Sequence, residues 1–522
     1  MRDETGVDVG DPARRRVLML GGLVVAGAGM RRLVPSLHAT AFESAPTVTG
    51  PITGGARGVP FGSPPAEDVA RRGYVMEEFL LAGTAHAYEA VPGTVAGRDG
   101  RWTVRVADER PYVTRFYVVR PADPARFNGV VVVHWQNVTG GVDLGTPFGS
   151  GTVSDEISRG YAWVGVTAQQ IGITGVSADR GVPGLPSKTL GLPGWDPGRY
   201  GALQHPGDAF SYEIFSQAGR VLRSRPAGGV DPLGGLRPRT LLATGGSQSA
   251  TRLVSYLNAA HPRDRVYDGF LLLYHWGLHQ PLVEQDHFEM FAPAGDGRYV
   301  GTCAVRDDQD VPVLVQSGEC EHSTWYPARQ PDSATYRHWE IAAVPHAPPR
   351  AAGPIATSTA GAVLGAPVVS PAEVTAGLMP NPIEWSYVLN AALRRLARWV
   401  ETKEPPASLP RIESEGGTIG RDPLGNALGG IRPPELDAPV ASYRGRNDAA
   451  PTQRSGAAGM GTILGTATPL AADVIAAMYP TREAYLARWD ASVDRLLASG
   501  VLLPEDAPAL RARGRTVVLP VA

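Results

Sequence analysis

The stretch that begins at Thr240 constrains the fold most, because a strand, a tight turn and a helix follow one another within it. Residues 240–244 form a short apolar and β-branched run, which is typical of a buried strand. Residues 245–249 are too small and polar to continue that strand. The apolar residues that follow have the spacing of one helix face: Ala250, Leu253, Val254 and Leu257. We expect this helix to end at His261-Pro262, which leaves Ser247 at the apex of the turn.

This arrangement is typical of the nucleophile elbow of α/β-hydrolases, with Gly245-x-Ser247-x-Ser249 in place of the commoner Gly-x-Ser-x-Gly. A sharp turn strains the backbone of the serine and holds its hydroxyl clear of the sheet edge. Gly245 and Ser249 are both small, as their close approach requires. The N-terminus of the following helix stabilises developing negative charge. The alternative is a glycine-serine turn of no chemical importance, because such short matches occur by chance.

The rest of the chain favours an α/β fold with a mostly parallel central sheet flanked by helices. We predict that residues 42–410 form an α/β-hydrolase domain with cap insertions at about 169–206 and 275–308. Residues 411–522 are expected to be a long C-terminal extension packed on that domain. The formal net charge of −2 over 522 residues gives no electrostatic reason to expect a nucleic-acid partner.

The N-terminus has the features of an export signal. Arg14, Arg15 and Arg16 precede an uncharged run over 17–30 that is too short and too weakly apolar for a membrane span. Ala39-Thr40-Ala41 fits a cleavage site, so residues 1–41 are predicted to be a signal peptide, of the twin-arginine type. A retained anchor is the alternative. We expect a secreted protein with no stable membrane insertion after signal removal, beginning with an extended leader over 42–63.

The two cysteines, Cys303 and Cys320, leave two possibilities open. In an oxidising compartment they could form a disulfide that pins the loop of the predicted catalytic acid. They could equally be two unpaired, partly buried thiols.

A continuous β-branched run over 130–133 predicts a central strand, and the loop after it is expected to help form an oxyanion hole. One backbone N–H would come from this loop, with Trp135, Gln136 and Asn137 as candidates. The other would come from Gln248, directly after the nucleophile. A plain strand-to-helix connection is the alternative interpretation of the loop.

A catalytic acid is expected after the strand at 311–315, where Glu319 and Glu321 both qualify. We prefer Glu321, which lies three residues after Gly318, and keep Glu319 as the alternative. An acid here would hold a histidine in the right tautomer.

The predicted base is His346, in a loop after a strand at 338–344. The chain order serine, glutamate, histidine is that of the α/β-hydrolases. His322 is too near the acid and His338 begins the strand, so both are weaker candidates.

The insertion that begins at His275 contains a candidate metal site. His275 and His279 have a spacing that could place two imidazoles on one helix face, and Glu284, Asp286 and His287 follow. Pro281 limits any such helix and no His-Glu-x-x-His pattern occurs, so we favour a cap segment and predict no metal or cofactor.

Taken together, several segments resemble a group of bacterial, often exported α/β-hydrolase domain proteins regarded as serine esterases. The segments that carry the resemblance are Val133-His-Trp-Gln-Asn-Val-Thr-Gly-Gly141, Gly160-Tyr-Ala-Trp-Val-Gly-Val166, His205-Pro-Gly-Asp208, Ile214-Phe-Ser-Gln-Ala-Gly219, Gly245-Gly-Ser-Gln-Ser249, Arg329-Gln-Pro-Asp-Ser333 and Tyr479-Pro-Thr-Arg482. The resemblance implies an α/β-hydrolase fold and supports Ser247 and His346. The group often has Ser-Glu-Thr-Asp where this chain reads Ser317-Gly-Glu-Cys-Glu321, which leaves the acid open between the two glutamates.

The sequence therefore predicts a secreted carboxylic ester hydrolase with a Ser247, His346 and Glu321 triad, acting on a small-molecule ester. An amidase or lactonase with the same triad is one alternative, since a fold does not determine its chemistry. A secreted binding protein that has kept the fold without the chemistry is another.

Overall fold

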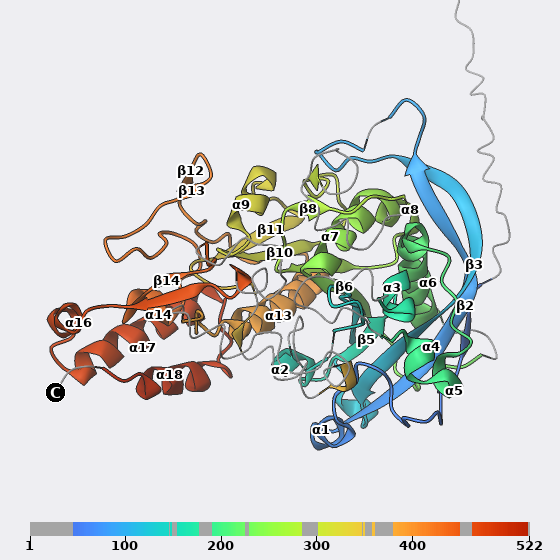
Figure 1. The fold of residues 1–522 in the computed structure, drawn as a ribbon, viewed down its shortest axis with the longest axis horizontal. Coiled ribbons are helices and arrows are strands. Elements are labelled where there is room, and N and C mark those ends of the chain that lie inside the picture. Colours follow the sequence, from blue (N-terminus) through green and yellow to red (C-terminus); the bar gives the residue numbers. More distant parts are fainter. Residues whose placement is uncertain are drawn as a thin grey trace, which may run out of the picture. The chain divides into compact units, whose positions relative to one another are not determined.

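A nine-stranded sheet in the order β1-β2-β3-β5-β4-β6-β7-β10-β11 forms the centre of the structure, a computed structural model (Figure 1). Its strands are β1 (Thr47–Thr49), β2 (Tyr74–Ala90), β3 (Val104–Pro121), β4 (Val130–Trp135), β5 (Ala162–Val166), β6 (Thr240–Gly246), β7 (Gly269–Leu273), β10 (Val313–Gly318) and β11 (Tyr336–Ile341). The pairs from β1 to β5 are antiparallel and those from β5 to β11 are parallel. The predicted α/β fold with a mostly parallel sheet is confirmed.

The structure describes residues 45–519 except 95, 146, 149–153, 177–189, 225–228, 284–300, 347, 350–357, 361–378 and 449–461. Residues Ser44–Ala522 form one compact unit, and Met1–Glu43, with the predicted signal peptide, lies outside the described residues. Within the described ranges, no helix is both long enough and apolar enough to cross a membrane.

Side chains alternate between two core layers along each central strand, as expected for a parallel sheet that is covered on both faces. In β4, for example, Val131 and Val133 enter one layer and Val132 the other. Helices α6 (Ser211–Arg223) and α7 (Gln248–Ser255) cover the first layer, and α2 (Ser154–Ile157) and α13 (Ser386–Thr402) cover the second. Ala250, Leu253 and Val254, which were expected on one helix face, lie on α7 and are fully buried.

The C-terminal elements lie on the α13 side of the sheet (Figure 1). They are α14 (Pro434–Asp437), β14 (Ala441–Arg444), β15 (Thr466–Pro469), α16 (Ala472–Met478), α17 (Arg482–Ser499) and α18 (Ala507–Thr516). Trp489, Val493 and Leu496 of α17 share a core cluster with Leu393 of α13. The helix α17 ends at Gly500, whose φ of 76° is that of a left-handed cap.

Short elements connect these layers. They are α1 (Ala66–Arg71), η1 (Pro124–Arg126), α3 (Gln170–Thr174), α4 (Leu192–Trp195), α5 (Pro197–Tyr200), η2 (Asp208–Phe210), η3 (Tyr256–Ala260), α8 (His261–Asp264), β8 (Leu278–His279), β9 (Gly301–Thr302), α9 (His322–Trp325), η5 (Tyr326–Ala328), β12 (Ser414–Glu415) and β13 (Thr418–Ile419).

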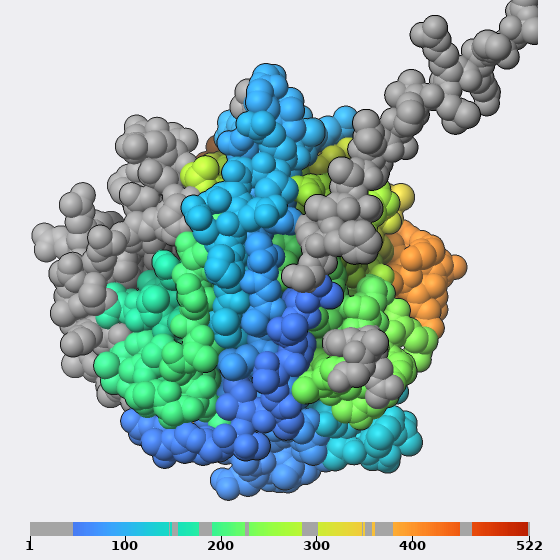
Figure 2. All heavy atoms as spheres, turned by 90° about the vertical axis from the view of Figure 1, so that its right-hand side faces the viewer, coloured from blue at the N-terminus to red at the C-terminus, as the bar shows by residue number. Residues whose placement is uncertain are grey.

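Two elements differ from the sequence expectation. The sequence pattern predicts separate strands at 102–106 and 112–119, but residues 104–121 form one long strand, β3, which pairs with β2 along its whole length. Figure 2 shows this pair as a blue band that runs down the face and projects at the top of the view. The predicted stop at His261-Pro262 is wrong, because a π-helical turn, η3, carries the chain into α8. Pro262 is tolerated there because it lies in the first turn of α8.

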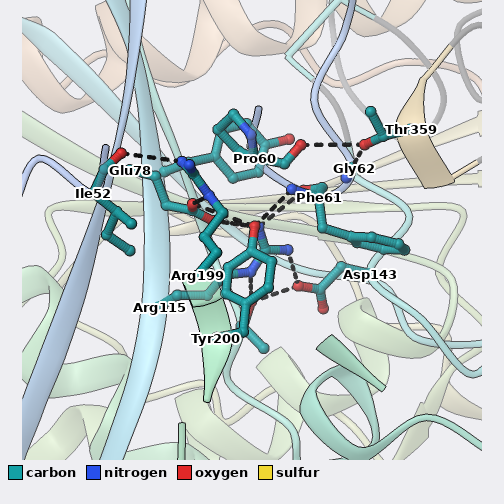
Figure 3. A network of polar contacts seen from close by, with 12 residues as sticks. Ile52, Pro60, Phe61, Gly62, Glu78, Arg115, Asp143, Arg199, Tyr200 and Thr359 are labelled. Atoms are coloured by element: carbon teal, nitrogen blue, oxygen red, sulfur yellow. Dashed lines mark hydrogen bonds and ion pairs between the residues drawn. The ribbon is translucent and has the colours of Figure 1, made fainter. Parts of the chain in front are cut away.

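A buried ionic network holds the start of the described chain against the sheet (Figure 3). It consists of Glu78, Arg115, Asp143 and Arg199. The Arg115 guanidinium lies 2.7 Å from Glu78 and 2.6 Å from Asp143, and all three side chains are fully or almost fully buried. Arg199 contacts the second oxygen of Glu78 at 2.5 Å. Because Asp143 belongs to the loop after β4, this network anchors the loop that was expected to form part of the oxyanion hole.

Candidate active site

Ser247 occupies the sharp turn between β6 and α7, with φ 57° and ψ −119°. A non-glycine residue at positive φ is strained and is held there by its surroundings. Ser247 N donates to Leu273 O at 2.9 Å, which fastens the turn to the end of β7. The turn has the geometry of a nucleophile elbow.

The hydrogen bonds of Ser249 explain why a serine can occupy the fifth position of the elbow. Its hydroxyl accepts from Gly246 N and donates to Gly246 O, both at 2.9 Å, so the side chain closes the turn. A Cβ at Gly245 would lie 3.0 Å from the Ser249 backbone, which explains the need for glycine there.

The structure brings Ser247, His346 and Glu321 together. His346 Nε2 lies 2.9 Å from Ser247 Oγ, and His346 Nδ1 makes a short hydrogen bond to Glu321. Glu321 is fully buried, and its second oxygen accepts from Gly318 N at 2.8 Å. Ser247 is half-buried, while the histidine and glutamate behind it are buried. This is the relationship expected of nucleophile, base and orienting acid.

Glu319, the alternative acid, has different partners. Its carboxylate accepts from Arg421 at 2.8 Å, from Ala343 N at 2.9 Å and from Gly445 N at 3.2 Å. Ala343 has a φ of 58° and turns the chain out of β11 towards His346. Glu319 therefore stabilises the loop that carries the histidine, and Glu321 is the glutamate that bonds to its ring.

The three residues considered for the oxyanion loop have different surroundings. Trp135 is the last residue of β4, and its buried indole donates to Gln169 at 3.1 Å. Gln136 N donates to Val166 O at 3.1 Å, in continuation of the sheet. The Asn137 side chain donates to Gly246 O at 2.9 Å, directly before the nucleophile. Of the three, Asn137 is the residue that bonds to the elbow.

Gln248, the other expected donor, is the first residue of α7, and N–H groups at that position have no partner within a helix. Its side chain donates to Gln169 at 2.8 Å, and Gln169 donates to Asp208 at 3.0 Å. Asp208 pairs with Arg252 of α7 at 2.8 Å, so the chain of bonds returns to the elbow helix. Burial alone would raise the pKa of Asp208, but Arg252 and its other donors hold it below the usual value.

Sequence reasoning missed two residues of this site. Gln169 has no motif to mark it, although Asp208, which accepts from its side chain, belongs to the His205-Pro-Gly-Asp208 segment of the resemblance. Trp276 donates its indole N–H to Ser247 Oγ at 3.3 Å, and its ring centroid lies 4.9 Å from that of His346. It follows β7 in a segment whose path the sequence pattern does not reveal.

His275 and His279 do not share a helix face, because residues 274–283 form no helix and Leu278–His279 is a short strand. Burial lowers the pKa of His275 to about 4. Glu284, Asp286 and His287 lie outside the described residues. Among the residues that are described, no three His, Cys, Asp or Glu side chains are grouped to hold a metal ion. Cys303 and Cys320 are both buried free thiols, so the disulfide alternative is not formed.

The elbow, the histidine and the glutamate all follow parallel strands and so meet at one edge of the sheet, which defines an α/β-hydrolase fold. The profile of the alpha/beta hydrolase domain family matches residues 48–512, and the chain belongs to this family.

Similar solved structures include esterase Est22, with 10% identity over 52% of this chain and 74% of that chain at a TM-score of 0.27. Methylesterase BT1017 shows 14% identity over 57% of this chain and 53% of that chain at a TM-score of 0.25. No curated protein matches the chain.

Proposed function

We propose that this protein is a serine hydrolase that cleaves carboxylic esters through an acyl-enzyme intermediate. The observation that carries the proposal is the Ser247 Oγ to His346 Nε2 distance of 2.9 Å, with Glu321 bonded to the other ring nitrogen. A serine hydroxyl is a weak nucleophile unless an adjacent base removes its proton. The strained elbow presents this hydroxyl where a substrate can reach it.

In the proposed reaction, His346 Nε2 takes the Ser247 proton while Oγ attacks the ester carbonyl. The backbone N–H groups of Gln248 and Asn137 stabilise the oxyanion. His346 then gives the proton to the departing alcohol, and an acyl-enzyme remains. Water attacks the acyl carbon with His346 again as base, and the acid leaves as Ser247 recovers its proton. Glu321 holds the imidazole in the tautomer with Nδ1–H and stabilises the imidazolium.

The test is hydrolysis of a short-chain chromogenic ester by the wild-type protein and by Ser247→Ala. We expect the variant to fold, as judged by its circular dichroism and melting temperature, and to lose turnover. Turnover equal to that of the wild type in the folded variant would refute the proposal.

Two rival functions need separate measurements. An amidase or lactonase with the same triad would be labelled by a fluorophosphonate at Ser247 but would prefer amides or lactones in a substrate panel. A binding protein on the same fold would not be labelled.

We also propose export by the twin-arginine route, from Arg14-Arg15 and the apolar run that follows. Replacing both arginines with lysine in the full-length protein should retain it in the cytoplasm. Unchanged export of that variant would contradict this route.

A further inference from the structure

We infer that Trp276 is a further catalytic residue, whose indole N–H stabilises negative charge on Ser247 Oγ. This inference rests on the proposed serine hydrolase function. The indole nitrogen lies 3.3 Å from Oγ, the atom that attacks and later leaves the acyl carbon. Trp276 therefore touches a reacting atom, on which His346 also acts.

The contact depends on a segment that is fixed on both sides of Trp276. Before it, Tyr274 has a φ of 52°, and its N–H donates to the Gln316 side chain at 3.1 Å. His275 N donates to Gln316 O at 3.1 Å, and His275 O accepts from Ser317 at 3.0 Å. These bonds attach the segment to β10, the strand that also leads to Glu321.

Gly277 fixes the other side. Its φ is 69°, and a Cβ added there would lie 2.4 Å from Trp325 Cα. Its carbonyl accepts from Cys303 N at 3.1 Å. Tyr274 and Gly277, both at positive φ, and the hydrogen bonds to β10 and to Cys303 fix the backbone from which the Trp276 side chain extends. The indole is thus positioned in advance, which is what electrostatic stabilisation of a reacting atom requires.

The hydrogen bonds at Oγ are compatible with one another. In the resting state, Oγ–H donates to His346 Nε2, and a lone pair of Oγ accepts from the Trp276 N–H. As His346 removes the proton, Oγ gains negative charge, and hydrogen bonds to charged groups are stronger than neutral ones. The Trp276 N–H thus favours the step in which Oγ forms its bond to the acyl carbon.

The same N–H acts in deacylation. His346 takes a proton from water, and the water oxygen forms a bond to the acyl carbon. When the bond between that carbon and Oγ breaks, its electron pair goes to Oγ, and His346 Nε2 returns the proton there. Trp276 donates to Oγ while this charge is present, so its loss should slow both half-reactions.

Trp276→Phe tests the inference, because it keeps an aromatic ring beside His346 and removes the N–H. The acylation and deacylation rate constants are measured from the burst and steady phases with a p-nitrophenyl ester of a short acid. The rate of labelling by a fluorophosphonate gives the attack step independently of the ester. Trp489→Phe is the matched control. The Trp489 indole N–H also makes one hydrogen bond, to Leu510 O at 2.9 Å, but this bond joins α17 to α18.

We expect Trp276→Phe to lower both rate constants and the labelling rate by about tenfold or more. Trp489→Phe should retain wild-type rates. Wild-type rates in Trp276→Phe, a change confined to KM, or an equal loss in the control would overturn the inference. Ser247→Ala separates the two hypotheses. If it keeps wild-type turnover, the proposed function fails, whereas an inactive Ser247→Ala beside a fully active Trp276→Phe rejects the role of Trp276 alone.

Discussion

Glu321 accepts the Nδ1–H of His346, which follows it by 25 residues in the chain. Glu319, only two residues before Glu321, does not make this bond. In Glu321→Gln the amide cannot stabilise the imidazolium, so we expect kcat to fall by about 10³–10⁴-fold, as when a triad aspartate becomes asparagine. Glu319→Gln should lower the melting temperature, because Arg421 loses its charged partner, while most of the kcat of the folded protein remains. Steady-state kinetics and thermal unfolding of both variants check this. The reverse pattern would assign the acid to Glu319.

Asn137 couples the loop after β4 to the elbow through its bond to Gly246 O. Asn137→Ala removes this bond, and also the bond that Asn137 Oδ1 accepts from Thr139 N at 2.9 Å, but leaves its own backbone N–H in place. We expect kcat to fall about tenfold with little change in KM, because a small displacement of a donor weakens transition-state binding most.

Asn128→Ala is the matched control for that variant. Asn128 lies just before the opposite end of β4, and its side chain accepts from Val130 N at 2.9 Å. Steady-state assays with the same ester should show wild-type kcat for this control. A similar loss in both variants would mean that general loosening of β4, and not the bond to the elbow, explains the effect.

Interruption of the buried network of Glu78, Arg115, Asp143 and Arg199 should lower the free energy of unfolding. Arg115→Met leaves Glu78 and Asp143 as buried carboxylates without their shared cation, which costs about 3–5 kcal/mol of unfolding free energy. Arg105→Met removes an exposed pair with Glu89 on the neighbouring strand and should change stability by no more than about 0.5 kcal/mol. Denaturant unfolding of both variants measures the difference. Similar values for the two would show that the network is not a stabilising feature.

The buried carboxyl of Asp264 should make the free energy of unfolding depend on pH. Burial, together with the charge of Glu213, raises the pKa of Asp264 from 3.8 to about 6. Between these values the folded protein binds more protons than the unfolded chain, so its stability falls as pH rises from about 4 to about 6. Asp264→Asn removes this titration, and its stability relative to the wild type should increase over the same range. Unfolding free energies at several pH values test this, and a constant difference would contradict it.

The candidate triad could be predicted because its residues follow strands whose patterns are strong. Ser247, Glu321 and His346 come directly after buried strands, and parallel strands bring such loops to one edge of the sheet. Trp276 and Gln169 could not be predicted in the same way. The spacing of His275 and His279 suggests a helix, but hydrogen bonds to β10 and to Cys303 hold this segment in an irregular path. Such long-range bonds have no local signature.

The network around Arg115 also limits where the N-terminus can be trimmed. Arg199 donates to Gly54 O at 3.0 Å and Arg115 donates to Phe61 O at 2.9 Å, so the segment expected as an extended leader supplies acceptors for two buried cations. β1 lies within the same segment and adds an edge strand to the sheet. Removal of residues 1–41 spares all of these groups. A cut after Phe61 would remove an edge strand and the carbonyl that accepts from Arg115, so a chain shortened there loses contacts that a chain beginning at residue 42 keeps.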